Sequence, residues 1–189
     1  SLSGGGTTGG NVALGANTLT TGDATNTTFA GVIGGTGHIV KQGSGTFTLS
    51  GANTYSGNTT IATGTLKLGN NSALGSEADP GKTVIQSGAT LDINGFRAGA
   101  TSNELVEVSG SGVGGNGAII NTGAGSYAFR RLVMTGDTTI RTDGGIYFDD
   151  NSGGAWTLDM NGHTLTKIGN EWLQLRYNTV IADEGNVNV

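Results

Sequence analysis

The chain has 189 residues, 37 glycines, no cysteine and a formal net charge of −5 at pH 7. The lack of cysteine excludes disulfides, thiol catalysis and thiolate metal sites. Nine Lys and Arg residues, most of them scattered, are too few for a phosphate-binding surface, so the composition argues against a nucleic-acid or anionic-membrane partner.

The first clear elements lie in residues 43–69, GSGTFTLSGANTYSGNTTIATGTLKLG. Within them TFTL (46–49) and TLKL (65–68) alternate apolar residues with polar ones, and glycine and asparagine separate the two runs. A period of two, together with β-branched residues and turn-forming punctuation, predicts short strands. We therefore expect this stretch to form one rung-and-turn unit of a stacked β-structure.

The same rhythm continues toward the C-terminus. It predicts further strands at KTVI (82–85), TLDI (90–93), VEV (106–108), AII (118–120), TTI (138–140), GIYF (145–148), WTLDM (156–160), HTLTKI (163–168), LQL (173–175) and TVI (179–181). The glycine-free segment 171–184 is the one place where a short helix is also compatible with the sequence. No apolar run approaches ~18 residues and there is no charged-then-apolar leader, so we expect neither a membrane span nor a signal peptide.

The spacing of these strands indicates a solenoid. TFTL and TLKL recur after 19 residues and TLKL and TLDI after 25, while the pattern L-D-x-N-G at 91–95 returns at 158–162, which corresponds to three steps of about 22. We expect an all-β parallel β-helix with about 19–25 residues per coil and eight or nine coils. The predicted interior column contains Phe47, Leu49, Leu66, Leu68, Leu91 and Ile93, and the predicted solvent side contains Thr46, Thr48, Lys67 and Asp92. Asn94-Gly95 and Asn161-Gly162 are expected at corners that need positive φ.

Residues 27–75 resemble the passenger-associated transport repeat, also called the autotransporter-associated β-strand repeat. Its pattern is met by Gly43, Gly45, Phe47, Leu49, Gly51, Asn53, Tyr55, Gly57, Thr59, Ile61, Gly64, Leu66 and Leu68, with Phe47 as the one departure from leucine. The resemblance implies a right-handed parallel β-helix in a large bacterial surface or secreted protein. It also implies a stalk or adhesin-like role, and it transfers no catalytic residue.

We therefore interpret residues 1–189 as a single β-helix segment of a longer protein, with the repeat at 27–75 and less regular coils over 80–189. The expected function is non-catalytic: a structural or adhesin-like segment that spaces or displays interaction regions, without a cofactor. The expected location is extracellular or on the bacterial cell surface, after export across the outer membrane.

The alternative is a β-helix fragment that binds or degrades polysaccharide, which would require a carboxylate cluster on one face. The candidates are Asp149-Asp150 with nearby Asp143, and the doublet Asp183-Glu184. Neighbouring strand residues face opposite ways, so a solvated loop is the favoured interpretation of DDNSGG. Ice binding through T-x-T strands would need a regular threonine array, and only scattered examples occur.

Two other motifs carry little chemistry. GVGGNG (112–117) satisfies G-x-G-x-x-G, but no helix is expected after it, so a glycine-rich turn is favoured over a nucleotide or calcium site. His38 and His163 lie far apart in the sequence, with no second histidine at ligand spacing, so both are expected at the surface and no metal site is expected.

One outward stripe is the candidate binding site. If Leu173 and Leu175 face inward, then Trp172, Gln174 and Arg176 face outward, and Tyr147 does so when Ile146 and Phe148 face inward. An exposed indole beside amide and guanidinium groups is suited to a sugar or a protein contact.

The expected partners are therefore neighbouring coils of the parent chain, and a surface glycan or a host or cell-surface protein. End-to-end self-association is also predicted, because uncapped coil ends present unpaired backbone groups.

Overall fold

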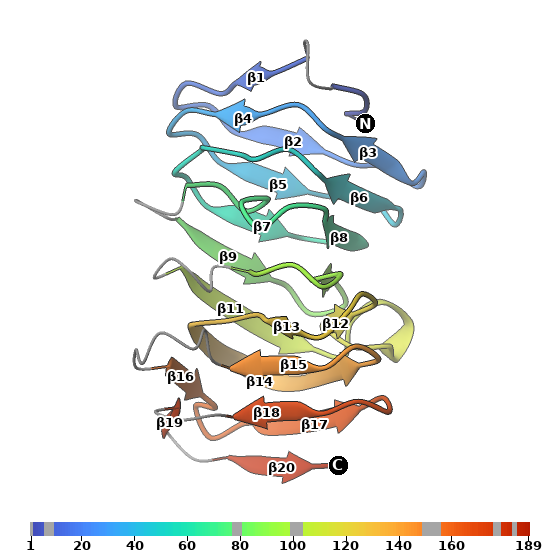
Figure 1. Ribbon diagram of the computed structural model, residues 1–189, viewed down its shortest axis with the longest axis vertical. Helices are drawn as coiled ribbons and strands as arrows, with labels where there is room; N and C mark the ends of the chain where they lie inside the picture. The colour runs from blue at the N-terminus through green and yellow to red at the C-terminus, as the bar shows by residue number, and fades with distance from the viewer. Residues whose placement is uncertain are drawn as a thin grey trace.

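The computed structural model describes residues 2–5, 10–76, 81–98, 104–148, 156–175, 179–182 and 185–189. In this part of the chain the strands stack as a β-solenoid of about seven turns, with the two termini at opposite ends of the rod (Figure 1). Every strand pairing in the described ranges is parallel. The prediction of an all-β parallel solenoid is confirmed.

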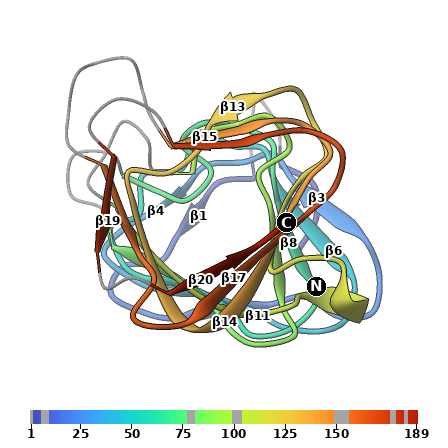
Figure 2. The same cartoon turned by 90° about the horizontal axis from the view of Figure 1, so that it is seen from below.

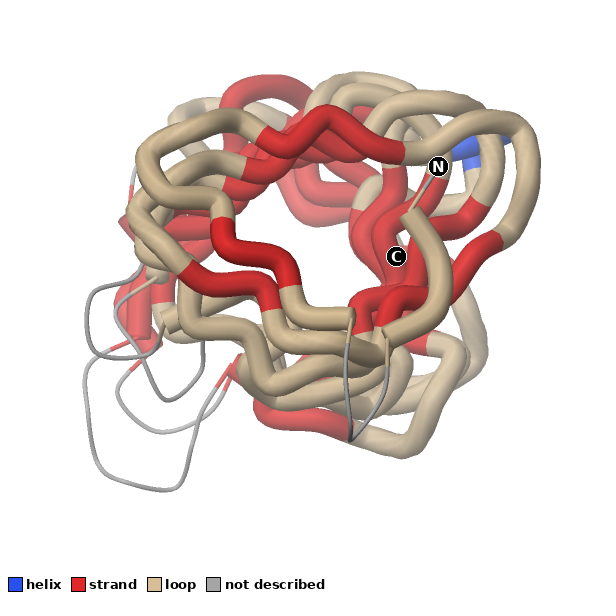
Figure 3. Tube along the Cα trace, turned by 90° about the horizontal axis from the view of Figure 1, so that it is seen from above, coloured by secondary structure: helices blue, strands red, loops and turns tan. Residues whose placement is uncertain are grey.

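The strands form three faces around a closed interior, as the views along the rod show (Figures 2 and 3). The first face contains β2 (Leu19–Thr21), β5 (Ile39–Lys41), β7 (Thr59–Ile61), β9 (Lys82–Ile85), β11 (Leu105–Gly110), the start of β14 (Arg131–Thr142), β16 (Trp156–Asp159) and β19 (Thr179–Ala182). The second contains β3 (Thr27–Phe29), β6 (Thr46–Leu49), β8 (Thr65–Leu68), β10 (Thr90–Asp92), β12 (Ile119–Asn121), the end of β14, β17 (Thr164–Ile168) and β20 (Asn186–Asn188). The third contains β1 (Val12–Ala13), β4 (Ile33–Gly34), β13 (Ser126–Tyr127), β15 (Ile146–Phe148) and β18 (Leu173–Leu175).

The interior is a set of apolar files, one per face. On the second face Phe47 pairs with Leu66, and Leu66 with Leu91. The predicted interior residues Phe47, Leu49, Leu66, Leu68, Leu91 and Ile93 are all fully buried. Removing each such side chain from water contributes roughly 1.5–3 kcal/mol, so three- and four-residue strands become stable only when they are stacked.

The glycine spacing of the repeat has a local explanation in the contacts between coils. A β-carbon on Gly51 would lie 2.1 Å from the carbonyl oxygen of Gly31 in the preceding coil, and one on Gly57 would lie 2.1 Å from that of Gly37. Glycine is required there because adjacent backbones approach too closely for any side chain. Fully buried Lys41 holds the next corner, where its Nζ donates to the carbonyl oxygens of Gln42, Gly43 and Thr63 at 3.0, 2.9 and 2.9 Å.

The two L-D-x-N-G motifs form the predicted corners. Asn94 and Asn161 have φ values of 48° and 52°. In each motif the aspartate Oδ1 accepts a hydrogen bond from the asparagine backbone N, at 2.9 Å for Asp92 and 3.0 Å for Asp159. The expectation that the two copies lie on one ladder is wrong, since Leu91 pairs within the second face and Leu158 within the first.

Two further expectations are corrected. Asp92 points outward from its strand but is only 3% exposed, because Lys67 (3.1 Å) and Thr122 (2.7 Å) cover its carboxylate. The solenoid has about seven turns rather than eight or nine, because some coils are longer than predicted: Leu91 pairs with Ile119, 28 residues on. The described residues of 171–184 form β18 and β19, which confirms the strands predicted there.

The helical element among the described residues is a 3₁₀ turn, η1 (Val113–Gly115), inside GVGGNG. It leads into β12, which is a strand, so the glycine-rich turn is the correct interpretation of this motif. No helix in the described ranges is long and apolar enough to cross a membrane.

Candidate functional site: an outward aromatic ledge

The third face carries an aromatic surface that we call the aromatic ledge, defined as Tyr127, Tyr147, Trp172 and Gln174. The register of β13, β15 and β18 produces it: Tyr127 pairs with Tyr147, and Tyr147 with Gln174. Ile146 pairs with Leu173 on the opposite, inward side. Alternation along each strand therefore puts the ledge residues on the outer side of the coil wall.

The three rings follow one another along the rod. The centroids of Tyr127 and Tyr147 lie 5.1 Å apart with a tilt of 32°, and those of Tyr147 and Trp172 lie 6.2 Å apart with a tilt of 47°. These spacings are close to the ~4.8 Å rise between stacked strands. Each ring therefore belongs to a successive coil.

Glycines form the floor beneath these rings. A β-carbon on Gly145 would lie 2.4 Å from Nε1 of Trp172, and one on Gly125 would lie 3.3 Å from Cε2 of Tyr147. The indole of Trp172 therefore lies over the backbone of the preceding coil, yet 54% of its surface stays exposed.

The structure brings together three of the four residues predicted for this site: Tyr147, Trp172 and Gln174. The fourth, Arg176, lies outside the described residues. Leu173 and Leu175 pair with inward Ile146 and Phe148 as predicted, but Leu175 is 39% exposed because β18 is the last described strand of the third face, with no described strand beyond it there. Sequence reasoning missed Tyr127, whose signal was the recurrence of tyrosine within Ser-Tyr-Ala-Phe (126–129) and Ile-Tyr-Phe (146–148).

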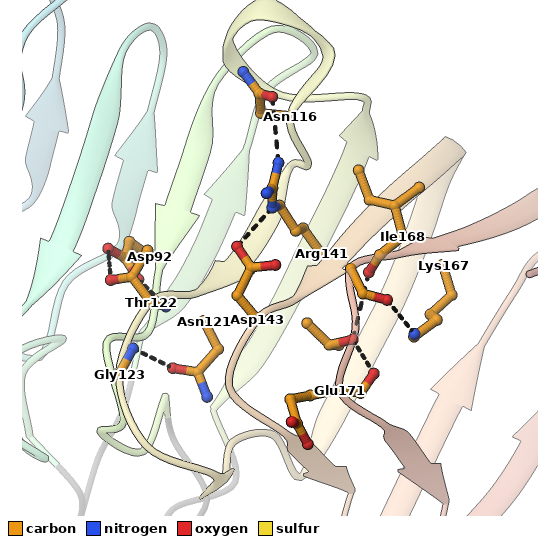
Figure 4. Close-up of polar contacts among 12 residues, drawn as sticks. Asp92, Asn116, Asn121, Thr122, Gly123, Arg141, Asp143, Lys167, Ile168 and Glu171 are labelled. Carbon is orange, nitrogen blue, oxygen red and sulfur yellow. Dashed lines mark hydrogen bonds and ion pairs between the residues drawn. The ribbon is translucent and has the colours of Figure 1, made fainter.

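The carboxylates needed for polysaccharide cleavage are engaged elsewhere in the described residues. Asp143 forms an ion pair with Arg141 at 2.7 Å, and Arg141 also reaches Oδ1 of Asn116 at 3.5 Å (Figure 4). Asp92 is covered by Thr122 in the same view. The doublets Asp149-Asp150 and Asp183-Glu184 lie outside the described ranges. No group of three metal-ligating side chains occurs among the described residues.

His38 is exposed, and its Nδ1 accepts a hydrogen bond from the backbone N of Asn58 at 2.8 Å. His163 is partly exposed, and its Nδ1 lies 3.9 Å from Oδ1 of Asp137. Both histidines therefore lie at or near the surface, where they support turns between coils.

A polar cluster inside the coils was not predicted. Thr83 donates to Oε1 of Glu104 at 2.5 Å, and the hydroxyls of Tyr55 and Thr59 lie 2.6 Å apart, with Thr59 paired to Thr83 in the next coil. Burial raises the pKa of Glu104 to about 7, partly opposed by the hydrogen bond from Thr83, and burial also raises the pKa of Tyr55. Because Glu104 is only 6% exposed, a polymeric substrate does not reach it, and the cluster acts on the stability of the coils.

The open end of the last described coils forms an apolar hollow of about 340 Å³, lined by Leu158, Met160, Leu165, Lys167, Trp172, Leu173, Leu175, Ile181, Val187 and Val189. Ile181 and Val187 continue the interior files of Leu158 and Leu165, yet they are 45% and 57% exposed. Such an end favours stacking of a further layer. Self-association through it stays a prediction.

Comparisons with known proteins agree with these features. The family model of the passenger-associated transport repeat matches residues 39–68. The adhesin BmaC autotransporter of Brucella suis biovar 1 (strain 1330) is 34% identical over 151 residues, which cover 71% of this chain and 4% of that relative. No solved structure gives a significant match.

Proposed function

The chain is a passenger-associated transport repeat protein, and on this premise we propose that it is a non-catalytic, adhesin-like segment of a bacterial surface or secreted protein. Its task is to hold interaction regions away from the cell as one section of a longer β-helical shaft. The proposal includes residues 1–189 as a single segment, with further coils of the parent chain as its neighbours.

One observation carries this proposal: the ladder of parallel strands on the first face runs from β2 to β19 without a break. On the first face, paired residues step from Leu19 through Ile39 and Thr59 to Ile181 at the other end. A wall of parallel backbone hydrogen bonds with a close-packed interior is stiff along its axis. A stiff rod is what a spacer needs, and a shaft needs no catalytic cluster.

The similarity to a named adhesin supports the surface location and the adhesin-like role. That relative is an autotransporter, and the matched region is a small part of its length. The alternative, a polysaccharide-binding or polysaccharide-degrading β-helix, gains its support from the aromatic ledge for binding. Degradation would need carboxylates that are free to act on the substrate, but Asp92 and Asp143 are each held in an ion pair.

The spacer role can be tested by placing the chain between an outer-membrane display anchor and a terminal fluorescent epitope. We expect the epitope to stand at one narrow height above a membrane dye, measured by energy transfer. A flexible Gly/Ser linker of equal residue count is the matched control and should give a broad, lower distribution.

Two results would contradict the proposal. The first is an epitope height indistinguishable from that of the flexible linker. The second is release of reducing ends or unsaturated products when the purified chain is incubated with neutral and acidic polysaccharides.

A further inference from the structure

We propose that the aromatic ledge binds a neutral, linear saccharide chain that lies along the axis of the rod. The inference deepens the proposed function, because it names the class of partner that this segment would bind. It rests on the proposed function for the location of the segment at the cell surface. The spacer role does not depend on it.

The strongest observation is the way Trp172 is held. Its indole covers Gly145 of the preceding coil, so one side is supported by backbone while 54% of the residue remains open to solvent. Burying a tryptophan is normally favourable, and the other tryptophan, Trp156, is 1% exposed beneath the guanidinium of Arg130 at 5.3 Å. In the described coils the indole is thus held as a preformed platform over Gly145, which is suited to stacking against a flat partner.

The arrangement of the three rings indicates a linear partner. Tyr127, Tyr147 and Trp172 occupy successive coils, with centroid separations of 5.1 and 6.2 Å. A glycan running parallel to the rod would meet one ring per coil, with consecutive sugar units against consecutive rings. The glycines beside the rings keep this path free of protruding side chains.

The polar groups of the ledge favour an uncharged sugar. The pyranose ring has C–H bonds on its faces and hydroxyls around its rim, and the ledge offers three aromatic rings together with tyrosine hydroxyls and the Gln174 amide. The charged side chains that precede β15 in the same coil, Arg141 and Asp143, are joined in an ion pair at 2.7 Å. The ledge therefore complements hydroxyl groups better than carboxylates or sulfates.

The test titrates the full chain with three neutral hexasaccharides, cellohexaose, maltohexaose and laminarihexaose, and with hexagalacturonate as the anionic counterpart. Binding is followed by tryptophan emission and by calorimetry. At least one neutral hexamer should bind and shift the emission of exposed Trp172, and its affinity should rise from disaccharide to tetrasaccharide as more rings are engaged.

Variants assign the site. Trp172→Ala should weaken binding roughly tenfold, as expected for the loss of one stacked ring. Trp172→Phe should recover part of it. Tyr127→Ala should weaken the longer oligosaccharides but not the disaccharide. Val113→Ala removes an exposed apolar side chain on a turn away from this face and should change nothing. The emission of buried Trp156 reports in every Trp172 variant whether the coils remain folded.

Four outcomes would overturn the inference: no neutral hexamer binds, only hexagalacturonate binds, Trp172→Ala binds as tightly as the unchanged chain, or the ledge captures a protein and no glycan. Each of these would leave the displayed height of the rod unchanged. Failure of the saccharide site is thus distinguishable from failure of the spacer role.

Discussion

Asn53 connects the coil before it with the coil after it. Its Oδ1 accepts a hydrogen bond from the backbone N of Ile33 at 2.9 Å, and its Nδ2 donates to the carbonyl oxygen of Ala73 at 2.7 Å. Asn121 has a similar role deeper in the stack, where its amide bonds Gly95 and Gly145 at 2.8 and 3.0 Å. Buried amides of this kind fix the register between coils, because a slip by one residue leaves both amide partners unsatisfied.

The buried carboxyl group of Glu104 leads to a prediction about how the stability of the chain depends on pH. Its folded pKa, about 7, lies above the ordinary value of 4.5, so the folded chain binds more protons than the unfolded chain between those values. The contribution of Glu104 to stability is therefore fully present below pH 4.5 and is lost as the pH rises through 7. The difference corresponds to roughly 3 kcal/mol.

The measurement is urea unfolding of the chain between pH 4.5 and 8.5. Glu104→Gln keeps the shape and a hydrogen-bonding group but cannot ionise, so its stability should be nearly flat over this range and should exceed that of the unchanged chain at pH 8. Exposed, salt-bridged Asp143→Asn serves as the control and should keep the slope. An unchanged slope in Glu104→Gln would show that another group is responsible.

At the scale of strands and coils, the sequence predicts local features more fully than tertiary ones. The alternation at Thr46–Leu49 and Thr65–Leu68 correctly gave strands, inward residues and their pairing. The described part of the first 45 residues contains five strands of two or three residues, too short for a periodic signal, and only the resemblance at 27–41 pointed to regular structure there.

The remaining misses depend on which coil covers which residue. Alternation correctly pointed Asp92 outward, but its burial depends on Lys67 and Thr122, which lie in other coils. Tyr127 belongs to the ledge only because its two-residue strand pairs with β15. Spacing alone could not place the second L-D-x-N-G corner on another face, because the coil lengths vary along the chain.

Because the coil is the repeating unit of the fold, deletion of one whole coil should leave the remaining coils in register. Leu19 pairs with Ile39, and Phe29 with Leu49, each twenty residues on, so deletion of Thr20–Ile39 removes one whole turn and keeps the register. We expect this variant to unfold cooperatively, with a strand-rich circular dichroism spectrum and a smaller urea m-value, in proportion to the surface lost.

The matched control deletes only Thr20–Phe29, half a turn, which would place strands of one face over those of another. It should lose the folded structure of the first coils. Equal tolerance of both deletions, or equal collapse, would contradict the coil as the unit of folding.

At the scale of the whole molecule, the two ends differ. The described N-terminal residues fold over the first coil: Leu2 packs against the core, and Gly4 bridges to Phe29. At the other end, Val180, Ile181 and Val187 are about half exposed. Exposed apolar side chains of the described strands therefore gather in β19 and β20.

The central claim, that successive coils stack in one parallel register along the whole rod, has a direct test. The outward file Thr20, Val40, Thr60, Val84, Glu107, Val133, Asp159 and Ala182 steps once per coil along the first face. Since the chain has no cysteine, pairs of introduced cysteines can be spin-labelled without background.

Labels at Thr20→Cys combined with Val84→Cys, Val133→Cys or Ala182→Cys are separated by three, five and seven steps. At ~4.8 Å per step, electron–electron double resonance should give narrow distributions of the distance between the labels, near 14, 24 and 34 Å before allowance for the label linkers. Distances that fail to increase linearly with the number of coils, or broad distributions for all three pairs, would contradict the stacked solenoid.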